Sequence, residues 1–220
     1  MLLYWSPRSP YARKATIAAH ETGTISGIEL KATVVLGMQP SETLMAMNPL
    51  GQIPLLIGRD GRPVYDSAAI CHYLDVELGD GRLHPIEPVA RTRMLRLHAI
   101  GDGLIALFLL WMGERSRQQP EQSAMRIAAI AKKLPFIFAA LDAEADAMRA
   151  EPFNAGHIAI AAALCYGDFR FSTDWPWRPR FPRLARWFAE VSERPSITAT
   201  AHFDELAAQR SIPDPVKGQA

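Results

Sequence analysis

The sequence contains few of the residues that define disulfide-rich, metal-binding or nucleic-acid-binding proteins. Cysteine occurs only twice in 220 residues, at Cys71 and Cys165, and both lie in apolar segments with helical spacing. Two cysteines exclude a disulfide framework and a four-cysteine metal site, so we expect two buried, inert thiols. The 24 basic residues nearly balance the 23 acidic ones, and the net charge of +1 does not favour a nucleic-acid or membrane partner.

Long uncharged segments are also scarce. Apolar uncharged segments near residues 103–113 and 152–167 are shorter than the roughly 18 residues that a membrane-spanning helix needs. The first residues lack the basic-then-apolar pattern of a secretory signal. With 49% hydrophobic and 21% charged residues, the composition is that of an ordinary globular protein, and we expect it to be cytoplasmic.

Residues 1–80 alternate between strand-like and helix-like segments. The second strand is rich in β-branched residues, and Asp60-Gly61 between the last two strands is typical of a tight hairpin. The order β-α-β-α-β-β-α predicts a thioredoxin-like α/β domain. Strands are expected at 1–5, 28–36, 53–58 and 63–65, and helices at 10–21, for about one turn within 37–47, and at 68–78.

Glycine, proline and charged residues replace the apolar pattern at 79–85, which predicts a linker. No strand pattern follows, so residues 86–210 are expected to form an all-helical domain and residues 211–220 a tail. Gly101 and Gly103 interrupt the first long helix, which predicts either a kink or a close approach of a second helix. Helices are expected at 89–117, 121–149, 154–171, 182–193 and 195–208, with an irregular connection at 174–182.

Ser9-Pro10 predicts where the first helix begins. A serine at the N-cap accepts from an unpaired backbone N–H, and proline at the first helical position loses nothing by lacking its own N–H. The Ser9 hydroxyl is therefore expected at the positive end of a helix, where an anion is stabilised.

Three stretches together resemble a known family. Ser9-Pro10-Tyr11-Ala12 is similar to the Cys-Pro-Tyr-Cys of glutaredoxins with both cysteines replaced, in the setting found in glutathione transferases. The stretch from Asn48 to Leu55, and Asp66-Ser67, resemble that family's two other glutathione-binding signatures. The resemblance covers nearly the whole chain. It implies a thioredoxin-like domain followed by an all-helical domain, glutathione as cosubstrate, a homodimer, and detoxifying conjugation of glutathione to small hydrophobic electrophiles.

The resemblance gives Ser9 the catalytic role of donating a hydrogen bond to the glutathione sulfur. Ser6 is a rival donor, because Ser6-Pro7-Arg8-Ser9 has the spacing of a C-x-x-C pair, and Tyr4 is a weaker rival within the first strand. Alternatively, Ser9 contacts no ligand and serves only as a helix cap. Without cysteine at position 9 the chain cannot form a mixed disulfide there, which disfavours thiol transfer.

The other site residues also come from the resemblance. It implies a cis Ile53-Pro54 bond that lets the Ile53 backbone pair with the cysteinyl part of glutathione. Asp66 would face the γ-glutamyl ammonium and Ser67 the carboxylate, although the same pair could be a plain helix cap. Gln52 is expected to contact the same tripeptide, and Gln39 is a weaker candidate. Residues 107–112 would line the electrophile pocket or belong to the core or a subunit interface.

Two other functions stay open. One is a non-enzymatic binding or regulatory protein on the same fold, like the stringent starvation proteins. The other is a glutathione-dependent isomerase, which is disfavoured because the Ser-Ser-Cys cluster of those relatives is missing. In the helical half, Asn154 is expected to cap a helix, and His157 occupies the position where the family's capping box has an acid.

Overall fold

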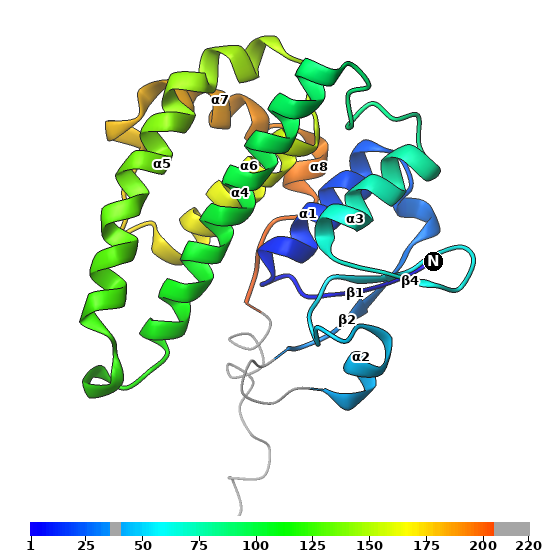
Figure 1. The fold of residues 1–220 in the computed structure, drawn as a ribbon, viewed down its shortest axis with the longest axis horizontal. Helices are drawn as coiled ribbons and strands as arrows, with labels where there is room; N and C mark the ends of the chain where they lie inside the picture. The colour runs from blue at the N-terminus through cyan, green and yellow to red at the C-terminus, as the bar shows by residue number, and fades with distance from the viewer. Residues whose placement is uncertain (36–40, 205–220) are drawn as a thin grey trace, which may run out of the picture.

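The computed structural model describes residues 1–35 and 41–204. A sheet-bearing part formed by the first half of the chain lies beside a helical part formed by the second half (Figure 1). The predicted tail at 211–220 lies outside the described residues.

The first half has the predicted order of strands and helices. Its elements are β1 (Leu2–Trp5), α1 (Pro10–Glu21), β2 (Glu29–Ala32), α2 (Glu42–Met47), β3 (Leu55–Ile57), β4 (Pro63–Val64) and α3 (Ser67–His72). The α3 helix continues in π-helical geometry through Glu77. The β2 strand ends at Ala32, earlier than the predicted 36, because its partner β1 ends at Trp5, opposite Ala32.

The four strands form one mixed sheet in the order β2-β1-β3-β4. The β1 and β2 strands are parallel, whereas β3 is antiparallel to both β1 and β4. Helices α1 and α3 pack together between the sheet and the helical part, and α2 lies on the other side of the sheet (Figure 1). This is the predicted thioredoxin-like arrangement.

The second half contains helices and no strand among its described residues. Its helices are α4 (Pro88–Arg115), α5 (Ala124–Ala150), α6 (Ala155–Phe171), α7 (Pro182–Ser192) and α8 (Pro195–Thr198). The α8 helix is shorter than the predicted 195–208, of which 205–208 lie outside the described residues. Arg13 explains the early end, since its guanidinium donates to the Ile197 carbonyl at 2.9 Å, an oxygen that a longer helix would use itself.

The α6 helix is the centre of the helical part. Residues 155–164 of this helix are all buried, which is typical of a helix surrounded by protein on every side. Its neighbour α4 approaches closely at Gly101, where a Cβ atom would lie 2.5 Å from the Ala159 backbone carbon. A Cβ at Gly103 would meet nothing within 4 Å. The Gly101 position therefore reflects close helix packing, one of the two predicted explanations.

The α4 helix also contains a long apolar window. An 18-residue window within it has a mean hydropathy of 1.5 and at most two charged residues, so by length and composition alone it could cross a membrane. The uncharged runs considered in the sequence miss this window, because such a run ends at its first charged residue. A core helix passes the same test, and α4 contributes the fully buried Leu97, Leu104 and Phe108 to the core.

The two halves are joined by polar contacts from α1. The buried Lys14 forms an ion pair with Asp102 of α4 at 2.5 Å. Glu21 accepts two hydrogen bonds from Arg194, at 2.9 and 2.7 Å. Because these partners are buried or partly buried, the contacts hold α1 in one position against the helical part.

The α6 N-terminus has a complete capping box. Asn154 accepts from the backbone N–H groups of Gly156 and His157, and the His157 Nδ1 accepts from the Asn154 N–H at 3.2 Å. A neutral histidine thus replaces the expected acid. Of the two cysteines, Cys71 is buried, which raises its pKa to about 12, whereas Cys165 is only partly buried.

Candidate functional site

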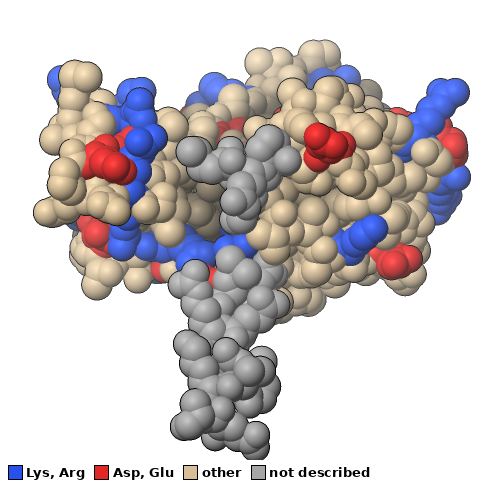
Figure 2. All heavy atoms as spheres, turned by 90° about the horizontal axis from the view of Figure 1, so that it is seen from below, with Lys and Arg blue, Asp and Glu red and all other residues tan. Residues whose placement is uncertain are grey.

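Two adjoining cavities lie between the sheet-bearing part and α4. The larger has a volume of about 640 Å³ and the smaller about 390 Å³, and both are lined by Tyr11, Gln52, Ile53 and Leu109. Viewed from below, the molecule is hollowed between its helical and sheet-bearing parts (Figure 2). Because the cavities share walls, one ligand can occupy both.

The turn after β1 carries the predicted catalytic serine. Ser9 is the N-cap of α1, and its Oγ accepts from the Ala12 N–H at 3.1 Å. Accepting that bond leaves the hydroxyl proton of Ser9 available as a donor. Ser9 is partly exposed and lines the smaller cavity, so the cap role and the donor role are compatible.

The two rival donors differ in position. Ser6 also lines the smaller cavity, but it is only 4% exposed, and its Oγ accepts from the Arg8 N–H at 3.3 Å. Tyr4 lies within β1, its ring is 5.0 Å from the Lys31 ammonium, and it lines neither cavity. Tyr4 therefore does not reach the cavities. Of the two serines that do, Ser9 is the more accessible.

The loop from Asn48 to Pro54 shapes the wall that the cavities share. The buried Asn48 side chain donates to the Gln52 carbonyl at 2.8 Å and accepts from the Leu50 N–H at 3.1 Å. Gly51 has a φ of +60°, a conformation that glycine adopts without strain. The Ile53-Pro54 peptide bond is cis, as the resemblance implies. Gln52, Ile53 and Pro54 all line the larger cavity.

The larger cavity is lined by two carboxylates. Asp66 is the N-cap of α3 and accepts from the Ala68 N–H at 3.0 Å, and the adjacent Ser67 is buried against the same cavity. Asp102 reaches the cavity from α4 while its carboxylate pairs with Lys14. A group that enters between Asp66 and Asp102 therefore meets a carboxylate from each half of the chain.

Tyr11 lies where the two cavities meet. Its hydroxyl donates to the Asp102 carbonyl at 3.3 Å. Burial, together with the charges of Asp102 and Asp66, raises the pKa of Tyr11 to about 12, so the phenol stays protonated near neutral pH. Behind it, burial and the charge of Lys14 lower the pKa of His98 to about 4, which keeps that imidazole neutral.

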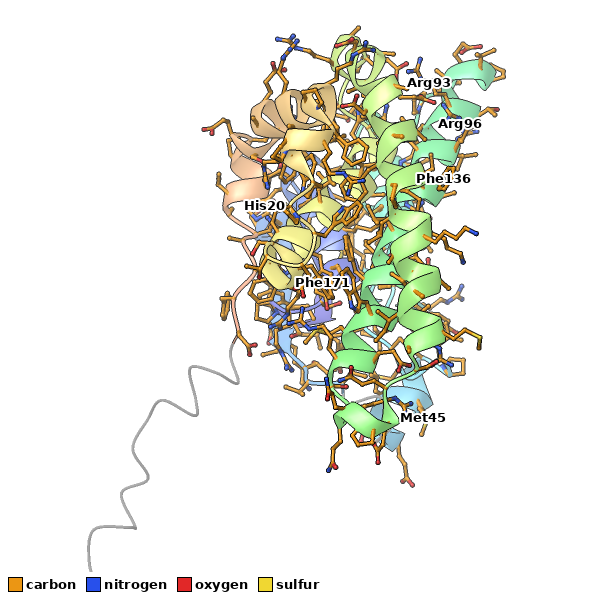
Figure 3. All side chains as sticks on the ribbon, turned by 90° about the vertical axis from the view of Figure 1, so that its left-hand side faces the viewer. His20, Met45, Arg93, Arg96, Phe136 and Phe171 are labelled. Carbon is orange, nitrogen blue, oxygen red and sulfur yellow. The ribbon has the colours of Figure 1, made fainter. Side chains whose placement is uncertain are left out.

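The predicted electrophile segment at 107–112 divides between the cavity and the core. Leu109 and Leu110 line the cavities, whereas Phe108 is fully buried and Trp111 stacks on Phe171 at 4.5 Å between ring centroids. Figure 3 shows Phe171 inside the helical part. Only part of the segment can therefore contact a ligand.

The structure adds cavity residues that the sequence did not single out. They are Tyr11, Asn48, Leu50, Asp102 and Ala106. Tyr11 and Asn48 lie within the sequence motifs described above, so those motifs could have indicated both residues. Asp102 had a weaker signal, an acid between two glycines in an apolar helix. Gln39 lies outside the described residues.

No set of metal ligands accompanies the cavities. Among residues 1–35 and 41–204, no group of three or more His, Cys, Asp or Glu side chains could hold a metal ion. The described lining residues of the two cavities carry hydroxyls, carboxylates, two side-chain amides and one guanidinium, together with apolar side chains.

Comparisons with known proteins identify relatives of this chain. Residues 8–77 match the family model described as glutathione S-transferase, N-terminal domain. A glutathione transferase family member from Pseudomonas fluorescens Pf-5 is 36% identical, and the match covers 92% of this chain and 99% of that one. The TM-score is 0.87 for its structure with bound glutathione and 0.83 for its structure with bound S-(propanoic acid)-glutathione.

Two curated proteins show the range of relatives. Glutathione S-transferase GstB of Escherichia coli strain K12 is 28% identical over 90% of this chain and 96% of its own length. A stringent starvation protein A homologue of Coxiella burnetii is 34% identical over 42% of each chain. Both enzymes and proteins with other names therefore share this sequence pattern.

Proposed function

This chain belongs to the glutathione S-transferase family, and on that premise we propose that it binds glutathione in the two adjoining cavities and conjugates it to small hydrophobic electrophiles. One observation carries the proposal: the three sequence signatures, far apart in the chain, line one continuous pair of cavities. Ser9 comes from the turn before α1, Ile53-Pro54 from the loop before β3, and Asp66-Ser67 from the start of α3.

The larger cavity receives the γ-glutamyl end of glutathione. Its ammonium faces the Asp66 carboxylate, and its carboxylate faces the Ser67 hydroxyl and the backbone N–H groups beside it. The cysteinyl part pairs with the Ile53 backbone at the shared wall, and Gln52 contacts the same tripeptide. This orientation directs the sulfur toward Ser9 and the smaller cavity.

Ser9 stabilises the thiolate and does not itself attack. A free thiol has a pKa near 8.5, so only about 3% is ionised at pH 7. Lowering that pKa by about two units ionises roughly three quarters and requires about 2.7 kcal/mol. A hydrogen bond to a charged group supplies about 1.5–3 kcal/mol. The helix N-terminus adds about 0.3–1 kcal/mol. One serine at the start of α1 is therefore sufficient without a general base.

The electrophile binds beside the sulfur against Val35 and Leu109 of the smaller cavity. The thiolate forms a carbon–sulfur bond to the electrophile, and the leaving group departs with its electron pair. Apolar walls favour a hydrophobic electrophile and exclude water from the reacting atoms. Thiol transfer is not part of the proposal, because no cysteine lines either cavity among the described residues.

A homodimer is the proposed working state. The outer face of α4 and α5 carries apolar side chains that water reaches freely, with Val89 and Phe136 both 74% exposed. Arg96 on α4 and Phe136 on α5 lie on the same side of the helical part (Figure 3). Exposed apolar surface of this kind is typical of an interaction site. We also place the protein in the cytoplasm, where glutathione keeps thiols reduced.

Titration calorimetry with glutathione between pH 6 and 9 tests the proposal. Wild type should bind glutathione and release a proton near neutral pH, and the Ser9→Ala variant should bind without that release. Ser6→Ala is the matched control and should behave like wild type. If Ser6→Ala loses the proton release instead, Ser6 is the donor. If wild type does not bind glutathione, the enzyme proposal fails.

A non-enzymatic regulatory role is the second candidate. The similarity to a stringent starvation protein A homologue over 42% of the chain favours it. Glutathione binding with full proton release, but without turnover of any activated aryl halide or alkyl halide, would support this role over the transferase.

A further inference from the structure

The chain beyond α8 returns to the turn that carries Ser9. The Nδ1 of His202 lies 2.7 Å from the carbonyl oxygen of Pro7, 195 positions earlier in the sequence. In Figure 1 the segment that follows α8 runs beside the N-terminal end of α1. A carbonyl oxygen can only accept, so the Nδ1 carries the proton and His202 is the donor. The turn before α1 is therefore bonded to a residue of the helical half.

Pro7 forms the corner of this turn. The Ser9 N–H donates to the Ser6 carbonyl at 3.0 Å, which is the bond that closes a four-residue β-turn, and proline is favoured at the second position of such a turn. Pro7 is buried, and a buried carbonyl without a partner costs free energy. His202 supplies a partner from outside the turn. The conformation of the turn therefore depends on the helical half as well as on its own residues.

Helix α6 holds the His202 ring in one orientation. The ring stacks on Phe169 with 5.2 Å between centroids and an interplanar angle of 12°, and it meets the Tyr166 ring edge to face at 5.6 Å. Because α6 is the buried central helix, these two aromatic side chains give the imidazole a rigid support. Burial, together with the charges of Arg13 and Arg170, lowers the pKa of His202 to about 4, so the imidazole is neutral near pH 7.

A second contact ties the other side of Ser9 to the same segment. Arg13 follows Ser9 by one helical turn, and its N–H donates to the Ser9 carbonyl at 3.0 Å. Its guanidinium donates to the Ile197 carbonyl at 2.9 Å and to the Thr200 Oγ at 3.4 Å. Pro7, before Ser9, and Arg13, after it, are thus both bonded to the segment that starts in α8. Ser9 lies between these two contacts.

We propose that His202 is a positioning residue for the reaction, because its bond to the Pro7 carbonyl fixes the turn from which the Ser9 hydroxyl reaches the glutathione sulfur. This role rests on the proposed glutathione function of the same site. Thiolate stabilisation needs a donor at hydrogen-bond distance, and a displacement of about 1 Å at a reacting centre costs about 100-fold in rate. Loss of the His202 bond should therefore raise the pKa of the bound thiol. The proposed contacts to the γ-glutamyl end come from α3 and should persist.

Two substitutions of His202 separate its hydrogen bond from its ring. His202→Phe keeps an aromatic ring against Phe169 and removes the donor. His202→Asn removes the ring and keeps a side-chain N–H that can donate to the Pro7 carbonyl. The matched control is His20→Phe, the same exchange near the other end of α1, because His20 lines neither cavity.

Titration of the thiolate absorbance of bound glutathione between pH 5 and 9 gives the pKa of its thiol in each variant. His202→Phe should raise that pKa by about one, a tenfold loss in the ionisation constant, because the hydrogen bond to the charged sulfur is weakened. His202→Asn and His20→Phe should stay close to wild type. With an activated aryl halide, kcat of His202→Phe should fall by up to about tenfold at pH 6 and recover at pH 9, while KM for glutathione changes little.

A double variant shows whether His202 acts through Ser9. In a Ser9→Ala protein, His202→Phe should raise the pKa of the bound thiol no further, because the donor that it positions is already missing. Nitrogen-15 NMR of wild type requires no substitution, so it keeps the proposal testable if His202→Phe does not fold. It should show the His202 proton on Nδ1.

Three results would overturn the role of His202: an unchanged thiol pKa in His202→Phe, an equal rise in His202→Asn, or a His202 proton on Nε2 in wild type. A loss of kcat that persists at pH 9 together with weaker glutathione binding would also overturn it, since the residue would then only support the fold. Absent glutathione binding in wild type, or a bound thiol whose pKa stays near 8.5, would instead refute the proposed function.

Discussion

Substituting Gly101 by alanine tests the close contact between α4 and α6 on which the cavity wall depends. A Cβ at this position would lie 2.5 Å from the backbone carbon, 2.7 Å from the Cβ and 2.8 Å from the carbonyl oxygen of Ala159. Ordinary contacts of a Cβ begin near 3.4 Å, so the helices must separate by about 0.9 Å. All three atoms belong to a buried helix and cannot rotate away, unlike the end of a flexible side chain.

Two effects of opposite sign determine how much Gly101→Ala changes the free energy of unfolding. Alanine in a helix interior is favoured over glycine by about 1 kcal/mol. Forcing extra volume into a packed core costs about 1–3 kcal/mol, and more where backbone atoms must move. We therefore expect Gly101→Ala to lower the free energy of unfolding by about 2 kcal/mol. Gly103→Ala has no neighbour within 4 Å and should raise it by up to about 1 kcal/mol.

Urea denaturation of the two variants measures this difference directly, and thermal melting provides a second reading. A change of 1 kcal/mol shifts the melting temperature of a chain of this size by about 2–4 °C. Gly101→Ala should thus melt several degrees below wild type and Gly103→Ala slightly above it. Because Asp102 lies between them on α4, Gly101→Ala should also weaken glutathione binding. A Gly101→Ala protein as stable as Gly103→Ala would refute the reasoning.

Asp66→Asn should keep the α3 cap, because asparagine caps as well as aspartate, while it removes the charge that we propose faces the γ-glutamyl ammonium. We expect unchanged stability and roughly tenfold weaker glutathione binding by calorimetry, and unchanged affinity would contradict the assigned role. Burial lowers the pKa of His157 to about 4, below the roughly 6.5 of an exposed histidine, so the unfolded chain binds its proton first as the pH falls. The stability due to His157 is complete above about pH 6.5 and is lost between pH 6.5 and 4. His157→Gln keeps an acceptor for the capping box but cannot titrate, and its unfolding free energy should fall less steeply over that range, by roughly 1 kcal/mol per pH unit.

Much of the fold followed from local sequence signals. The Ser9-Pro10 start of α1, the Asp60-Gly61 hairpin and the order of the first seven elements were predicted and are confirmed. These features depend on residues within one or two turns of each other, since caps and tight turns are made by near neighbours. The lengths of β2 and α8 were wrong. The end of β2 is set by β1, and the end of α8 by Arg13.

The residues of the candidate site also fall into two groups: those that short motifs indicate and those that only tertiary packing brings to the cavity. Ser9, Ile53-Pro54 and Asp66-Ser67 could be named from short motifs, because each motif is a turn or helix start formed by residues adjacent in the chain. Asp102 could not, because it reaches the cavity only after α4 packs on α1 and pairs with Lys14. The sequence also left the reason for Gly101 open between a kink and a close approach, and the packing of α6 decided it.

The sequence by itself determined the types of element, their order, the helix starts and the family motifs. The tertiary structure alone decided which α4 side chains face the cavity and the accessibility of Ser9 relative to Ser6. The physical reason is the range of the interactions. Caps and turns are satisfied within a few residues, whereas a cavity is the space left when surfaces from distant parts of the chain meet.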